Sequence, residues 1–133
     1  MATEMLERFE AIEECYEFML AYAAQGLASD EGSKSGRQVR EFLNRAVVAL
    51  DGLADGCAAA LQEASIGNGA CPPAFLGVLD RDASDTLAAI ELVLAQPVIS
   101  SQLIDNLNAS IHLRALLTDL FLIDETLKLR TKT

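Results

Sequence analysis

The most constraining feature of this chain is the spacing of apolar residues in its second quarter. Between residues 35 and 65 they recur at alternating intervals of four and three, which places them along one side of an α-helix. The stripe consists of Val39, Leu43, Ala46, Leu50, Leu53, Cys57, Ala60 and Ala64. Neighbouring helices have to cover such a stripe, because its side chains would otherwise remain in water.

Two other segments also have helical patterns. Residues 3–27 repeat the four-three alternation from Met5 to Ala23. Residues 73–95 start with a proline and stop before Pro97, which favours a helix with these limits. Within this third segment we expect a kink or a split near Gly77 to Asp82.

The fourth segment, residues 101–128, begins at Ser101, a suitable N-cap, and is apolar nearly all round between Ile111 and Ile123. Helices of this composition are covered on more than one side. The segment therefore carries more apolar surface than the core of a four-helix protein needs.

Short polar or glycine-containing connections separate the four segments. Residues 29–33 form one, and Gly67, Asn68 and Gly69, followed by two prolines, form another. The length of 133 residues suits one domain. We predict an all-α, single-domain antiparallel four-helix bundle over residues 1–133, with up-down-up-down topology.

The charge and the cysteine content restrict the partners and the compartment. The net charge of −10 disfavours nucleic acids and anionic membrane surfaces, and favours a basic protein partner. The three cysteines form no C-x-x-C pair, which is typical of reduced thiols. The acidic N-terminus does not resemble a signal peptide, and no apolar run approaches the roughly 20 residues of a membrane span. We therefore expect a cytoplasmic protein.

Four carboxylates of the first segment share one broad helix face: Glu10, Glu13, Glu14 and Glu17. They form either a solvated face, which also suits the positive end of the helix dipole, or a docking face for a basic partner, and a metal or small-ligand site is the further alternative. Di-iron bundles require Glu-x-x-His motifs on two helices. The only histidine of this chain, His112, is preceded three residues earlier by Ala109, so a complete site of that kind is excluded within one chain. We expect no cofactor.

Small residues climb one side of the second segment at Ala49, Gly52, Gly56 and Ala59. Each glycine inside a helix costs about 1 kcal/mol relative to alanine. A local kink, close helix packing or a homodimer contact would each explain why the glycines are present.

Two residues are weak candidates for chemistry. His112 falls on a narrow polar stripe with Asp105, Asn108 and Asp119, and a lone exposed histidine on a bundle is similar to a phosphotransfer site, although the usual lysine is missing. Cys71 lies just before the third segment, where a helix N-terminus would activate its thiol. Neither residue has an evident partner for catalysis.

The charges of the first two segments also predict their register. Residues 34–45 are basic, and in an antiparallel hairpin Arg45 falls opposite the region of Glu14 to Glu17.

Taken together, these patterns favour a non-enzymatic protein-interaction module, such as an adaptor, an assembly chaperone or an inhibitor of a partner. We expect it to act through helical faces as a homo-oligomer. Binding of a metal or small ligand by the first-segment carboxylates is the alternative, and phosphotransfer at His112 is a remote one.

Overall fold

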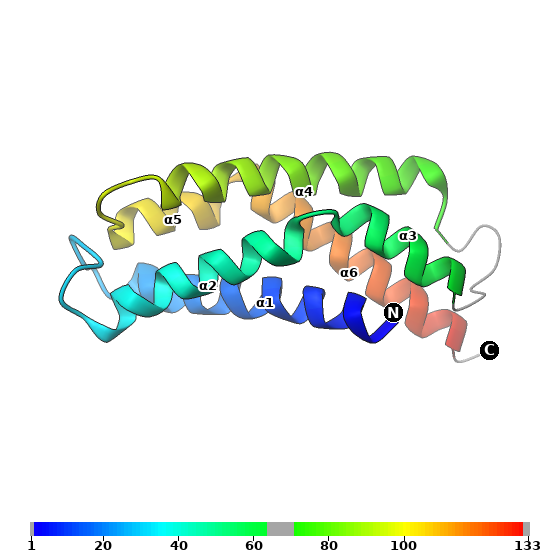
Figure 1. The fold of residues 1–133 in the computed structure, drawn as a ribbon, viewed down its shortest axis with the longest axis horizontal. Helices are drawn as coiled ribbons and strands as arrows, with labels where there is room; N and C mark the ends of the chain where they lie inside the picture. Colours follow the sequence, from blue (N-terminus) through cyan, green and yellow to red (C-terminus); the bar gives the residue numbers. More distant parts are fainter. Residues whose placement is uncertain (1, 64–70, 132–133) are drawn as a thin grey trace.

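The computed structural model of the chain describes residues 2–63 and 71–131, and these residues form six α-helices and no strand (Figure 1). The predicted all-α class is therefore confirmed. The predicted count of four helices is not, because two of the four segments are each divided. The helices are α1 (Ala2–Ala24), α2 (Lys34–Leu50), α3 (Leu53–Glu63), α4 (Pro73–Leu94), α5 (Ser101–Ala109) and α6 (Ile111–Thr131).

The segment predicted as one helix over residues 35–65 is divided at Asp51 and Gly52. Asp51 closes α2 by donating its backbone N–H to the carbonyl of Val47, at 3.1 Å. Gly52 then takes a φ of +66°, a conformation that glycine adopts without steric cost. The apolar stripe continues across this break, so its periodicity gave no sign of the turn.

The segment predicted over residues 101–128 is divided at Ser110. This residue has an extended backbone, and its Oγ accepts a hydrogen bond from the N–H of Leu113 at 3.3 Å. Ser110 therefore ends α5 and caps the start of α6. Ser100, and not the predicted Ser101, caps α5 through the N–H of Leu103.

The third segment does not show the expected kink or split. α4 runs without interruption through Gly77 and Asp82. The turn predicted at Gly67, Asn68 and Gly69 lies outside the described residues.

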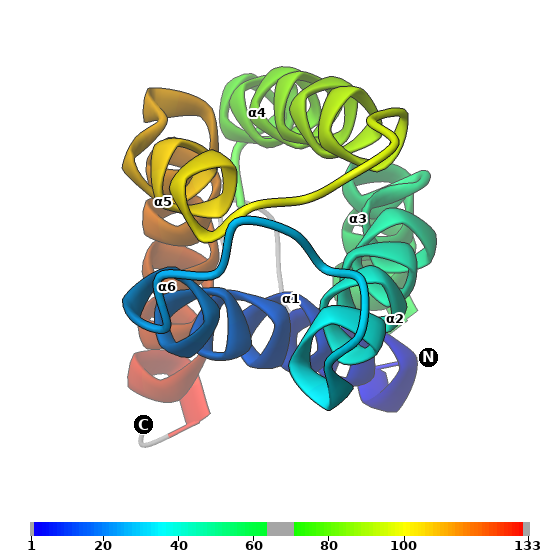
Figure 2. The same cartoon turned by 90° about the vertical axis from the view of Figure 1, so that its left-hand side faces the viewer.

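The helices surround one apolar cluster (Figures 1 and 2). α1 packs against α2 and α3 on one side and against α5 on the other, while α4 packs against α2, α3 and α6. The residues at the centre are mainly aliphatic, as the low aromatic content of the sequence implies. The largest fully buried side chains include Leu43, Leu53, Leu79, Ile90, Leu116 and Leu120.

A polar network joins the connection after α1 to the connection after α4. The buried carboxylate of Asp30 accepts hydrogen bonds from Arg40 Nε at 2.6 Å and from the N–H of Ile99 at 2.7 Å. Arg40 also donates to the carbonyl of Gln96 at 3.1 Å. The Arg40 bond, together with the one from Ile99, holds the pKa of Asp30 below its usual range despite burial.

The predicted register of the first two segments is confirmed. Arg45 Nη2 of α2 lies 3.0 Å from Glu14 Oε2 of α1. Both side chains are about half exposed, so the pair orients the helices more than it stabilises them.

Candidate functional site

The acidic face predicted on α1 is present as a surface. Glu10, Glu14 and Glu17 are exposed, and Glu13 is half-buried. Glu14 is already engaged with Arg45. Within residues 2–63 and 71–131, no three histidine, cysteine or acidic side chains come together as a group that could hold a metal ion. The four carboxylates therefore lie along the surface of α1 without being gathered into such a group in the described part of the chain.

The small-residue stripe is not one surface, because the turn at Gly52 interrupts it. Ala49 is buried in α2, whereas Ala59 is exposed on α3. Arg8 of α1 lies against both sides of the turn: its guanidinium donates to the carbonyl of Asp51 at 2.7 Å, and its Cζ would lie 3.9 Å from a Cβ at Gly56. Gly52 therefore lies in the turn between two helices and not inside one continuous helix.

The three thiols differ in burial. Cys15 and Cys57 are buried in the core, and burial raises the pKa of each to about 12. Cys71 is half-buried before α4, and burial raises its pKa as well. This shift is opposite in direction to the lowering of the pKa that activation by the helix N-terminus requires.

The polar stripe around His112 is divided by the break at Ser110. His112 is exposed on the first turn of α6, and its carbonyl accepts a hydrogen bond from Thr86 at 2.9 Å. Asp105 is exposed on α5, whereas Asn108 and Asp119 are buried. The structure does not assemble these side chains around the imidazole.

Two aspartates instead meet between α4 and α6. Asp119 of α6 is only 5% exposed and is hydrogen-bonded to Asp82 of α4. Burial, this hydrogen bond and the charge of Asp82 raise the pKa of Asp119 to about 7. Its second oxygen, Oδ2, has no partner among the described residues.

The solvent side of α6 is the most unusual surface of the molecule. Ile111, Phe121 and Leu122 are 72%, 58% and 53% exposed. On the other described helices, large exposed apolar side chains occur singly or far apart, as do Leu6 and Leu20 on α1. We call the α6 face the set of exposed residues Ile111, Arg114, Thr118, Phe121, Leu122 and Glu125.

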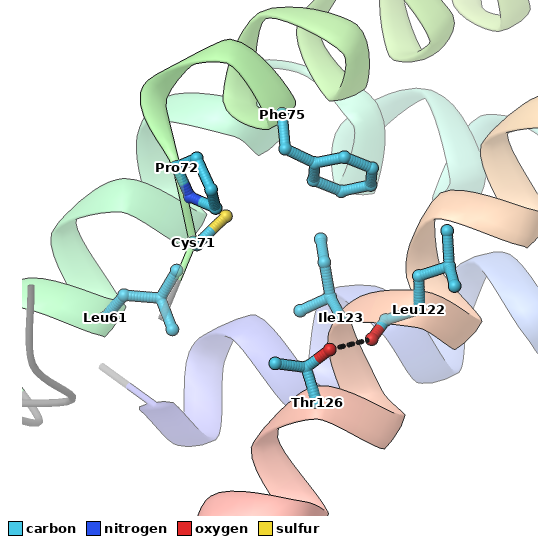
Figure 3. Close-up of a pocket in the computed structure, with 7 residues that line it drawn as sticks. All are labelled: Leu61, Cys71, Pro72, Phe75, Leu122, Ile123 and Thr126. Carbon is cyan, nitrogen blue, oxygen red and sulfur yellow. Dashed lines mark hydrogen bonds between the residues drawn. The ribbon is translucent and has the colours of Figure 1, made fainter. Parts of the chain in front are cut away.

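An apolar pocket of about 260 Å³ adjoins the α6 face at Leu122 (Figure 3). In this view Phe75 and Cys71 lie on one side and the α6 side chains on the other. The hydroxyl of Thr126 donates to the carbonyl of Leu122 at 2.7 Å, so it is satisfied within the helix. The residues that line the pocket are Leu61, Cys71, Pro72, Phe75, Leu122, Ile123 and Thr126.

A shallower hollow of about 350 Å³ lies along the other end of the same helix. It is lined by Ile111, Arg114, Ala115, Thr118 and Asp119. The two hollows lie in succession along α6, with exposed apolar side chains beside them. This arrangement suits an elongated partner lying along the helix.

The apolar surplus of α6 was visible in the sequence, but the residues of the face were not. Identifying Phe121 and Leu122 as exposed requires knowing which side of α6 packs on α4. The pocket could not be anticipated at all, since Leu61, Phe75 and Leu122 come from three separate helices.

Comparisons with known proteins add no relative to this description. No protein-family model, no curated protein sequence and no solved structure matches the chain. Within the described residues, no helix is both long and apolar enough to cross a membrane.

Proposed function

We propose that this chain is a non-enzymatic protein-interaction module that binds a helical segment of a protein partner along the α6 face. The observation that carries the proposal is the exposure of Ile111, Phe121 and Leu122 by more than half on one side of α6. Burial of a large apolar side chain contributes about 1.5–3 kcal/mol, which favours covering these residues. A helix lying on an apolar face is a common mode of peptide recognition.

The proposal also includes the arrangement of the helices and the location of the protein in the cell. The six helices act as four antiparallel rods, α1, α2 with α3, α4, and α5 with α6, in up-down-up-down order. The rods leave the outer side of α6 free for the partner, and the protein works in the cytoplasm with reduced thiols. The arrangement in Figure 2, where α5 and α6 form one side of the molecule, supports this interpretation.

A photo-crosslinking amino acid tests the proposal directly. Placed at Thr118 in the native cell, between the apolar residues of the α6 face, it is expected to give crosslinked adducts that mass spectrometry can identify. The matched control places the same amino acid at Leu92, which is 66% exposed on α4. Equal adducts at both positions, or none at Thr118, would overturn the proposal.

The two alternatives remain predictions with weaker support. Metal binding by the α1 carboxylates would have to displace Arg45 from Glu14 or recruit ligands from another chain. Phosphotransfer would use His112, which is exposed, whereas Asp119 is buried and hydrogen-bonded to Asp82.

A further inference from the structure

Four residues of the α6 face follow the spacing of a helix-pairing seam. Arg114, Thr118, Phe121 and Glu125 are separated by four, three and four residues, and all four are exposed. They therefore lie on one side of α6 over about three turns. In paired helices, residues at alternating intervals of four and three form the row of side chains that one helix presents to the other.

The seam is also complementary to itself. It has a cation at one end, Arg114, and an anion at the other, Glu125. If a second α6 lies antiparallel across it, Arg114 meets Glu125 of the partner subunit, and the two-fold axis repeats the pair. We propose that the occupant of the α6 face is a second copy of this chain, which rests on the proposed function and names its partner.

The same register satisfies the middle of the seam. The pair Arg114 and Glu125 and the pair Thr118 and Phe121 have the same midpoint along the helix. The alignment that joins the charges therefore also places each small Thr118 opposite the larger Phe121 of the partner subunit. Large side chains facing small ones let two helices interdigitate closely.

The net charge of the chain and the small size of the contact both limit the affinity of this dimer. Each copy carries −10, so association is opposed by repulsion that salt screens beyond about 8 Å at physiological ionic strength. The seam itself contributes one charge of each sign from each copy. A contact over about three turns is small, below roughly 1,200 Å² in total, which is typical of weak and reversible complexes. We expect a dissociation constant in about the micromolar range.

Sedimentation equilibrium with exchanged charges tests the register. Wild-type protein is expected to pass from monomer to dimer as its concentration rises. Arg114→Glu and Glu125→Arg each place like charges opposite one another, and each is expected to raise the dissociation constant about tenfold or more. All these positions are exposed, and circular dichroism verifies that the variants remain helical.

Mixing the two variants provides the decisive result. One carries Glu at both ends of the seam and the other carries Arg at both ends, so a heterodimer of the two restores both opposite-charge pairs. We expect the mixture, and also the double variant R114E/E125R, to recover the wild-type dissociation constant. Glu10→Arg on α1 makes the same charge change as Glu125→Arg but away from the seam, and is expected to leave the dimer intact.

Three results would overturn the proposal: a wild-type monomer at every concentration, a dimer indifferent to both single variants, or no recovery on mixing. A failure of the dimer can be distinguished from a failure of the proposed function. If wild type is monomeric but the crosslinker at Thr118 captures another protein, the α6 face is a docking site and the dimer is wrong. If neither occurs, both proposals fall.

Discussion

At the scale of single residues, the constraints are steric at Gly36 and electrostatic at Asp119. Gly36 lies in the first turn of α2, buried against the backbone of Asp30. Asp119 places a carboxyl group in the contact between α4 and α6, beside the carboxyl group of Asp82. At both positions a substitution is expected to change the stability of the fold, and each position gives a separate prediction.

Replacement of Gly36 by alanine is expected to destabilise the protein by about 2–3 kcal/mol, a typical cost of overpacking. A Cβ at this position would collide with the carbonyl of Asp30, whose side chain joins the two connections through Arg40. Urea unfolding measures the effect. Gly77→Ala is the matched control, because a Cβ there meets only Arg81 Nη1 at 3.6 Å. It is expected to stabilise α4 by up to about 1 kcal/mol; equal effects of the two changes would contradict this packing.

Asp119 makes stability depend on pH in a defined direction. Its pKa is raised to about 7 in the folded protein, against about 3.9 in an unfolded chain. Between these values the folded state binds the extra proton, so this group's contribution to stability falls as the pH rises and is lost above about pH 7.

Asp119→Asn removes that titration and keeps a donor for Asp82. The excess of the variant's unfolding free energy over that of wild type is expected to grow by about 1 kcal/mol or more between pH 5 and pH 8. Urea unfolding at the two pH values measures the difference. A difference of the same size at both would show that Asp119 is not protonated in the fold.

At the scale of the helices, the two unpredicted breaks decide which surfaces exist. The turn at Gly52 interrupts the small-residue stripe, and the cap at Ser110 separates His112 from Asn108 and Asp105. Each break therefore places the residues of one predicted stripe on two helices instead of one. Because of the second break, α6 begins at Ile111, and this residue is also the first residue of the α6 face.

Two glycine substitutions distinguish a helix terminator from a packing residue. Gly52→Ala is expected to destabilise by about 1 kcal/mol through its positive φ, although no atom lies within 4 Å of the added Cβ. Gly56→Ala lies inside α3, where the nearest atom is Arg8 Cζ at 3.9 Å, and is expected to stabilise by about 0.5–1 kcal/mol. Thermal unfolding compares them. Stabilisation by both would mean that α2 and α3 are one helix in solution.

The sequence predicted the helical segments and the Arg45–Glu14 register because both depend on local periodicity and charge. It did not predict the breaks, since the apolar stripe continues across Gly52 and a single serine ends α5. The surplus of apolar residues in the last segment was recognised, but its exposed subset depends on how α6 packs on α4. The neighbouring pocket depends on three helices and left no local pattern.

At the scale of the whole molecule, an acidic surface is combined with exposed apolar side chains on α6. The net charge of −10 opposes association of two copies, so the proposed dimer depends on the specific contacts of the α6 face. The core, built from aliphatic side chains of all six helices, leaves Ile111, Phe121 and Leu122 outside. The side of α6 turned away from the core is therefore where another chain is expected to bind.

Hydroxyl-radical footprinting of Phe121 in the intact cell tests that claim most directly. If the α6 face is covered, Phe121 is expected to be oxidised several-fold more slowly in the cell than in dilute purified protein, while Leu92 on α4 reacts alike in both. Equal oxidation rates of Phe121 in the two settings would contradict it.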